Sequence, residues 1–126
     1  MKPLICIVDD EPELLENLRY ELQALRPDWD VQAFGNGFGA LQLLLSGRIN
    51  LVLTDIAMPD MDGYDLFGRV KDYDPNIPVI MMTGFGYDPN HVLVRAKVDG
   101  LKDVIFKPFD IDKLIALIDK KLSERE

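Results

Sequence analysis

Apolar and polar positions along the chain follow two periods, one typical of buried strands and one typical of amphipathic helices. The run Leu4–Val8 is apolar throughout and stops at Asp9, as expected for a strand that is buried on both faces. Pro12 then suits the first turn of a helix. Leucines recur in one stripe after it, at Leu14, Leu18, Leu22 and Leu25. Because Pro27 ends this stripe, the pattern predicts a strand followed by one helix.

The same strand-then-helix unit recurs along the rest of the chain. The other predicted strands are Asp30–Phe34, 51–54, 78–82 and 102–106. The other predicted helices run through Leu41, Leu44 and Leu45 to near Gly47, over 62–73, over 89–98, and through Ile111, Leu114, Ile115, Ile118 and Leu122. Residues 30–34 alternate more than the other strands, as an edge strand does. Strands alternating with helices favour parallel pairing and right-handed crossovers. We therefore expect an α/β fold, a three-layer sandwich with helices on both faces of one parallel sheet.

Length and composition narrow the class of protein. The 126 residues fit one domain, 1–126, and no stretch has the composition of an interdomain linker. The formal net charge of −8 would repel a nucleic-acid backbone or an anionic membrane surface, so we expect neither as a direct partner. No apolar run approaches the roughly 20 residues of a membrane helix, and the first apolar run is too short for a signal peptide. The expected location is the cytoplasm.

Cysteine and histidine usage restricts the chemistry. Cys6 is the single cysteine and lies inside an apolar run, which favours a buried, unreactive thiol. His91 is the single histidine and is expected on the surface of the helix at 89–98. A conventional zinc site needs more ligands of these two types. Any metal bound here must be held by oxygen atoms.

Polar residues follow the predicted strands at their carboxyl ends, where an open parallel sheet forms its functional crevice. These residues are Asp9, Asp10, Asp55, Thr83, Gly84 and Lys107. Two carboxylates at about 4 Å repel by roughly 4 kcal/mol in a surface-like dielectric, so three together call for cations. Lys107 supplies one positive charge. A hard divalent ion such as Mg²⁺ would supply two more.

Four motifs in this order carry a resemblance that covers essentially the whole chain. They are VDDE at 8–11, TDIAMPDMDG at 54–63, MTG at 82–84 and KPF at 107–109. Together they resemble the receiver domain of response regulators in bacterial two-component signalling. The resemblance implies a flavodoxin-like, doubly wound (βα)5 fold with the strand order 2-1-3-4-5.

The resemblance also implies a phosphoacceptor and a metal site. Asp55 would attack the phosphorus of a phosphohistidine on a sensor histidine kinase or a histidine phosphotransfer domain. Asp10, Asp55 and the backbone carbonyl of Ala57 would bind Mg²⁺ or Mn²⁺, and Asp9 would contribute indirectly. Phosphoryl transfer needs in-line positioning and charge neutralisation, which such a site provides.

Two further side chains complete the implied site. Thr83 would place its hydroxyl on the phosphoryl group and Lys107 would pair with that group, while the amides of Ala57 and Gly84 donate to it. The domain would thus assist its own phosphorylation and dephosphorylation without being an enzyme in the usual sense. The chain departs from the family at Val104, three residues before Lys107, where an aromatic residue is usual. It departs again at Ala57, where many relatives carry a polar side chain.

The implied output is conformational. Recruitment of Thr83 and Lys107 to the new charge would change the surface around the fourth helix, fifth strand and fifth helix. That surface would control a downstream protein or a covalently linked output domain, and a homodimer of the phosphorylated form is one arrangement that the resemblance allows.

Three alternatives remain. The segment GNGFGA at 35–40 fits the dinucleotide-binding pattern G-x-G-x-x-A, follows a strand, opens a helix and has Asp55 twenty residues on. A receiver-like adaptor would keep the fold without phosphorylation. A turnover phosphatase is disfavoured, because enzymes that form an aspartyl phosphate usually carry a second Asp where Ala57 stands.

The loop after Asp55 contains three more aspartates with simpler expected roles. Asp62 precedes Gly63 and fits a helix N-cap, and Asp65 falls in the acidic first turn. Asp60 is expected to face water. The bond between Lys107 and Pro108 is expected to be cis, because the family usually has it so.

Overall fold

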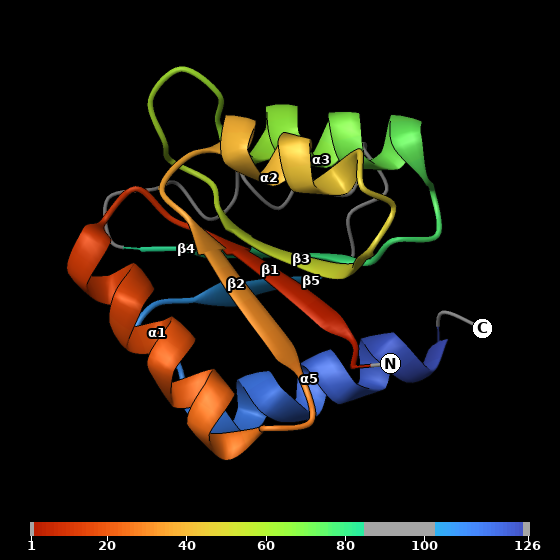
Figure 1. Ribbon diagram of the computed structural model, residues 1–126. Coiled ribbons are helices and arrows are strands. Elements are labelled where there is room, and N and C mark those ends of the chain that lie inside the picture. The colour runs from red at the N-terminus through yellow and green to blue at the C-terminus, as the bar shows by residue number, and fades with distance from the viewer. Residues whose placement is uncertain (1, 85–102, 125–126) are drawn as a thin grey trace.

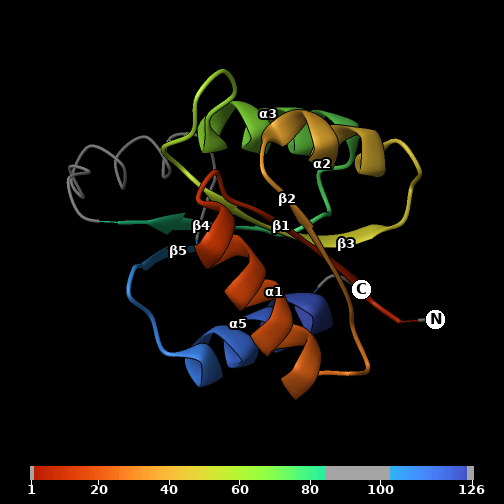
Figure 2. The ribbon, with the colours of Figure 1, turned by 60° about the vertical axis from the view of Figure 1, so that its left-hand side comes forward.

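The protein folds into a five-stranded parallel sheet between two layers of helices (Figures 1 and 2). The structure is a computed structural model and describes residues 2–84 and 103–124. The strands are β1 Leu4–Val8, β2 Asp30–Phe34, β3 Ile49–Asp55, β4 Val79–Thr83 and β5 Asp103–Phe106. They lie in the order β2-β1-β3-β4-β5, which confirms the predicted fold.

Of the helices that the structure describes, two cover each face of the sheet. Helices α1 (Pro12–Leu25) and α5 (Ile111–Glu124) pack on one face, and α2 (Gly37–Leu44) and α3 (Gly63–Tyr73) pack on the other (Figures 1 and 2). The predicted helix at 89–98, with His91, lies outside the described residues. Among the helices that the structure describes, none has the length and apolar character needed to cross a membrane.

Alternation along the central strands divides the core into two clusters. Ile5, Ile7, Leu51 and Leu53 face α1 and α5, whereas Cys6 and Val52 face α2 and α3. The thiol of Cys6 is fully buried, and this desolvation raises its pKa to about 12. Trp29 and the methionines Met58, Met61, Met81 and Met82 are buried packing residues, as the sequence indicates.

The leucine stripe of α1 differs from the prediction. The buried residues are Leu15, Leu18 and Leu22, whereas Leu14 is half-buried and Leu25 is 51% exposed. Leu14 instead lines a hollow with Pro108, Phe109 and Ile111 of the segment that enters α5. Leu25 is the last residue of the helix, where the chain turns away toward β2.

Helix α2 also buries fewer leucines than predicted. Leu44 is buried and Leu41 packs partly against the core, but Leu45 is 72% exposed. The helix has already ended at Leu44, and Gly47 then takes a φ of 76°, a left-handed turn that glycine adopts without strain.

Strand β3 is longer than the predicted 51–54, because it begins at Ile49 and ends at Asp55. The register of β1 against β3 shifts between Leu4 and Ile5, which leaves Asn50 as an extra residue. The Asn50 side chain uses this place to accept the Leu4 backbone N–H at 2.8 Å. Because Asn50 is polar, the apolar pattern placed the start of this strand at residue 51 instead of Ile49.

Candidate functional site

The carboxyl ends of β1, β3, β4 and β5 bring the predicted site residues together at one edge of the sheet. Asp9 follows β1, Asp55 ends β3, Thr83 ends β4 and Lys107 follows β5. Asp9 and Asp55 are buried, while Asp10 is exposed. One carboxylate oxygen from each of these three aspartates lies within 4.8 Å of the others.

Lys107 bridges two of these carboxylates. Its Nζ donates to an Asp9 oxygen at 2.7 Å and lies 3.4 Å from an Asp55 oxygen. The second oxygen of Asp9 accepts the Glu11 backbone N–H at 2.9 Å. The Lys107 backbone N–H donates to the Thr83 carbonyl at 2.7 Å, and the bond to Pro108 is cis, as predicted. Both ends of the ion pair are thus anchored by backbone.

The electrostatics of the cluster disfavour a fully ionised state without a further cation. Burial raises the pKa of Asp55 from 3.8 to about 6, and the charge of Asp9 adds to this effect while Lys107 opposes it. Burial acts to lower the pKa of Lys107, but hydrogen bonding to Asp9 and the charges of both carboxylates outweigh it, so that this pKa is raised. Lys107 is therefore held in its charged form.

The hydroxyl of Thr83 is the one buried side-chain N or O atom, among the residues described, that has no hydrogen-bond partner. Thr83 is 2% exposed and follows Met82, which is paired in register with Asp55. An unpaired buried hydroxyl is unfavourable, since it loses its bonds to water. Thr83 therefore offers a free donor at the same strand edge as Asp55.

Gly84 also lies at this edge. A Cβ built on Gly84 would lie 3.9 Å from Cδ of Lys107. Ala57, in the loop after β3, is exposed. The expected roles of the Ala57 carbonyl and of the Ala57 and Gly84 amides remain predictions.

The other three aspartates of this segment lie in the loop after β3 and in the first turn of α3, as expected. Asp62 caps α3 by accepting the Asp65 backbone N–H at 2.9 Å, and Asp65 returns a bond to the Asp62 N–H at 3.3 Å. Asp60 is exposed and has a φ of 68°. None of these three belongs to the carboxylate cluster formed among the described residues.

Val104, at the position where the family usually has an aromatic residue, is half-buried against the core on the α2 and α3 side of the sheet. It pairs in register with Met81. Two residues further along the same face, Phe106 pairs with Thr83 and is 47% exposed. An aromatic side chain therefore neighbours Thr83, although from a different position.

The Gly-rich segment before α2 has a packing explanation. A Cβ on Gly37 would lie 2.6 Å from Sδ of Met61, so the start of α2 packs closely on the loop after β3 and a larger residue would require the Met61 side chain to shift. The Asn36 side chain accepts the Gly39 backbone N–H at 3.1 Å and so caps the first turn itself. Asp55 lies in the carboxylate cluster. The segment follows β2 and opens α2, as the dinucleotide-binding alternative requires, but Asn36 caps the helix start and Asp55 belongs to the carboxylate cluster, which disfavours that alternative.

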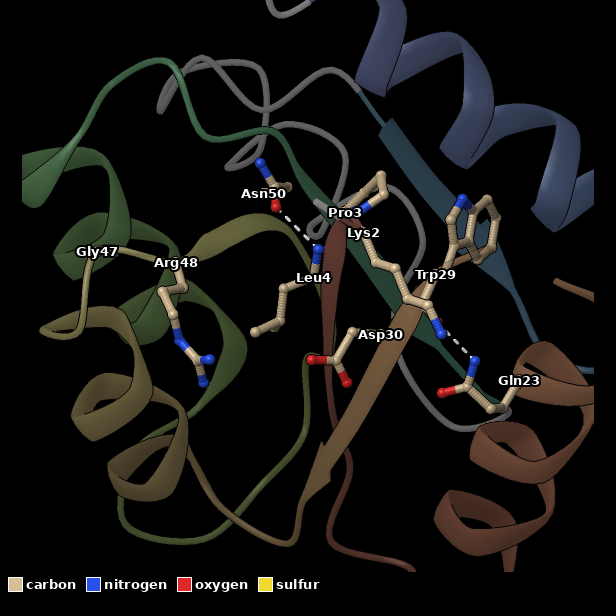
Figure 3. A pocket seen from close by; sticks show the side chains of 9 residues that line it. All are labelled: Lys2, Pro3, Leu4, Gln23, Trp29, Asp30, Gly47, Arg48 and Asn50. Carbon is tan, nitrogen blue, oxygen red and sulfur yellow. Dashed lines mark hydrogen bonds between the residues drawn. The ribbon is translucent and has the colours of Figure 1, made fainter. Parts of the chain in front are cut away.

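A hollow lies at the opposite ends of the strands (Figure 3). It measures about 580 Å³ and is lined by Lys2, Pro3, Leu4, Gln23, Trp29, Asp30, Gly47, Arg48 and Asn50. The Gln23 side chain donates to the Trp29 carbonyl at 2.7 Å and accepts the Val31 N–H at 3.0 Å. These bonds connect α1 to the start of β2, so the polar side chain of Gln23 supports the fold at this end of the strands.

Sequence reasoning missed one residue next to the site. Gly63 begins α3 in contact with the backbone of Asp55 and Ile56. From the sequence it was only the residue after a helix cap. The short separation between Asp55 at a strand end and Gly63 at the start of the next helix is the feature of the sequence that could have indicated this contact.

The donor set fits a hard divalent cation. Three carboxylates supply oxygen ligands, which Mg²⁺ and Mn²⁺ prefer, and their mutual repulsion favours a cation between them. A doubly wound parallel sheet with carboxylates and a lysine at its carboxyl edge defines the class of this protein, an α/β domain with an acidic switch-point site.

The chain belongs to the response regulator receiver domain family, whose model matches residues 5–119. It is 34% identical over 113 residues to the C4-dicarboxylate transport transcriptional regulatory protein DctD of Rhizobium meliloti, covering 90% of this chain and 24% of that protein. It is 33% identical over 120 residues to the DNA-binding transcriptional regulator NtrC of Escherichia coli K12, covering 95% and 25%. The chain thus spans about a quarter of the length of these curated relatives.

Solved structures agree with this assignment. A CheY-like receiver domain protein from Methanospirillum hungatei JF-1 superposes with a TM-score of 0.88 at 28% identity, covering 99% of this chain and 97% of that one. The family places the chain in two-component signal transduction, as a signalling domain rather than a classical enzyme. The resemblance seen in the four motifs is confirmed.

Proposed function

We propose that this chain is a phosphoacceptor receiver domain, residues 1–126, that takes a phosphoryl group onto Asp55. The single observation that carries the proposal is the convergence of Asp9, Asp10 and Asp55, from two strand ends, with Lys107 at 2.7 and 3.4 Å from Asp9 and Asp55. A purely structural ion pair would not need the third carboxylate.

The donor in this proposal is a phosphohistidine of a sensor histidine kinase or a histidine phosphotransfer domain. An Asp55 oxygen forms a new bond to phosphorus while the bond from phosphorus to the imidazole nitrogen breaks, and the imidazole leaves with that electron pair. Asp55 suits the nucleophile role because β3 fixes its backbone while the following loop leaves the carboxylate reachable.

Charge neutralisation is the main contribution of the site in this mechanism. Mg²⁺ or Mn²⁺, held by Asp10, Asp55 and the Ala57 carbonyl with indirect help from Asp9, would supply two positive charges next to the transferring group. Lys107 turns from Asp9 toward the phosphoryl oxygens, and the free hydroxyl of Thr83 donates to them. The amides of Ala57 and Gly84 donate as well.

The same groups link phosphorylation to output. Drawing Thr83 and Lys107 toward Asp55 biases the segments after β4 and β5, and so the surface of the fourth helix, β5 and α5. That surface would control a downstream protein or a covalently linked output domain, in the cytoplasm, and could pair two phosphorylated copies. The NtrC relatives, which are named as DNA-binding transcriptional regulators, extend well beyond the receiver, and this supports an output domain as the DNA-contacting part.

The proposal is tested with acetyl phosphate or beryllofluoride in the presence of Mg²⁺. Wild type should gain one phosphoryl group by intact-mass analysis, and Asp55→Asn should gain none. No labelling of wild type, under conditions that label a related receiver, would overturn the phosphoacceptor proposal and favour the adaptor. Labelling that persists in Asp55→Asn would move the site, and NAD binding by the same sample would revive the dinucleotide alternative.

A further inference from the structure

Helix α3 begins in direct contact with the backbone of the proposed phosphoacceptor. The Gly63 N–H donates to the Ile56 carbonyl at 2.9 Å. A Cβ on Gly63 would lie 2.5 Å from the Asp55 carbonyl oxygen and 2.9 Å from Cα of Ile56. Both neighbours are backbone atoms, so no side-chain rotation can relieve the clash. Only glycine allows this approach.

The helix is not free to move away from the strand. Its first turn is closed by the reciprocal bonds between Asp62 and Asp65. Further along, Leu66, Phe67 and Val70 are buried against the sheet at 0%, 4% and 1% exposure. Because close-packed interiors transmit strain, an added methyl group at the start of α3 would press on the end of β3.

The end of β3 is equally confined. The Asp55 carbonyl oxygen accepts the Thr54 hydroxyl at 3.0 Å, and the Ile56 N–H donates to the Met82 carbonyl at 3.1 Å. The carboxylate of this same Asp55 lies 3.4 Å from Nζ of Lys107. A backbone shift of a few tenths of an ångström would therefore change how the carboxylate meets the rest of the site.

We propose that Gly63 is a positioning residue for phosphoryl transfer, since its missing side chain lets α3 hold the backbone of Asp55 where the carboxylate meets Asp9, Asp10 and Lys107. The inference rests on the proposed function. It assigns no contact between Gly63 and the reacting atoms. Its effect is exerted through Asp55 alone.

The chain offers two matched controls on the same helix. A Cβ on Gly68 would meet nothing within 4 Å, so Gly68→Ala adds a methyl group to α3 without strain. Val70 is buried at 1% exposure in a later turn of the helix, so Val70→Ala destabilises α3 by loss of packing. Gly68→Ala shows whether a methyl group elsewhere on α3 changes the phosphorylation rate. Val70→Ala shows whether a less stable α3 changes it.

The experiment measures the rate of phosphorylation by acetyl phosphate at saturating Mg²⁺. Urea unfolding of each variant gives its folded fraction, so that the rate is expressed per folded molecule. Gly63→Ala should lower the rate by about tenfold or more, as small misplacements of a reacting group do. Gly68→Ala and Val70→Ala should keep the wild-type rate. The double variant G63A/G68A should regain stability, because alanine favours helix, without regaining the rate.

Two results would overturn the inference. The first is a phosphorylation rate of Gly63→Ala equal to that of Gly68→Ala. The second is a rate of Gly63→Ala equal to that of Val70→Ala when the two variants have the same free energy of unfolding. If Gly63→Ala does not fold, the double variant in an excluded osmolyte supplies the folded protein, and a wild-type rate there refutes positioning. Failure of wild type and Gly68→Ala to label would overturn the proposed function, and the inference with it.

Discussion

Lys107 is held more closely by Asp9 than by Asp55, at 2.7 against 3.4 Å, although 98 positions separate Lys107 from Asp9 in the chain. Asp9 is fully buried and the Lys107 side chain is only 13% exposed. The cation thus rests on the carboxylate that is not the proposed phosphoacceptor. A phosphoryl group on Asp55 would compete with Asp9 for Nζ of Lys107. Phosphorylation of Asp55 would therefore weaken the ion pair that stabilises Asp9.

Removal of the Lys107 ammonium group should destabilise the domain. Lys107→Met leaves the buried Asp9 without its partner, and breaking a buried pair in this way costs about 3 kcal/mol or more. We expect the free energy of unfolding in urea, without divalent ions, to fall by about that amount. Mg²⁺ should restore part of the loss, because it can neutralise the same carboxylates.

Lys121→Met is the matched control for Lys107→Met. Lys121 pairs with Asp103 at 2.9 Å and with Glu124 at 3.2 Å, but its partners are 21% and 47% exposed. Exposed pairs contribute about 1 kcal/mol or less. Equal losses in the two variants would show that the site pair is an ordinary surface interaction.

The carboxyl of Asp55 should give stability an unusual pH dependence. Its pKa is raised from 3.8 to about 6, mainly by burial, so between these values the folded state holds a proton that the unfolded state has lost. Stability from this group therefore falls as pH rises through that window, and above it the full penalty is present, on the order of 3 kcal/mol. Urea unfolding at a series of pH values from about 4 to about 7, without metal, measures this fall in the free energy of unfolding.

Asp55→Asn isolates this contribution, because the amide does not titrate. The difference in unfolding free energy between wild type and Asp55→Asn should change across the window and be flat above it, with the variant more stable near neutral pH. Mg²⁺ should flatten the difference, since it favours the ionised carboxylate. A pH-independent difference without metal would mean that Asp55 ionises normally.

The sequence predicts that the side chains of this site lie together, because the ends of buried strands can be identified from it. Leu4–Val8 is apolar on both faces, and a parallel sheet must bring the residue after such a run to the same edge as Asp55. The approach of Gly63 was not predictable in the same way, because it depends on how α3 packs after the seven residues that separate Gly63 from Asp55. Periodicity also mistook Leu25 for a core residue, since a stripe does not say where the helix passes the edge of the sheet.

The hydroxyl of Thr83 should matter for phosphate and not for folding. It is buried without a partner among the described residues, so Thr83→Val removes an unsatisfied group and should change the unfolding free energy by about 1 kcal/mol or less, toward greater stability. The same change should weaken beryllofluoride binding about tenfold, by loss of one hydrogen bond to a charged group.

Thr83→Ser keeps the hydroxyl and loses only the methyl group. It should bind beryllofluoride close to the wild-type affinity, while losing about 1 kcal/mol of stability through reduced packing. Thr83→Val therefore loses binding without losing stability, whereas Thr83→Ser loses stability without losing binding. Equal binding by Thr83→Val and wild type would remove Thr83 from the proposed site.

Cys6 should report on the whole fold. Its side chain is fully buried on the face of the sheet that α2 and α3 cover, and its pKa is raised to about 12, so the native thiol should not react with a disulfide reagent near neutral pH. Labelling then requires opening of the core, and its rate follows the population of the open state. Beryllofluoride with Mg²⁺ at about 100 times its dissociation constant should slow labelling of wild type by about 100-fold. Asp55→Asn should show no such slowing, and rapid labelling of the native protein would contradict the burial of Cys6.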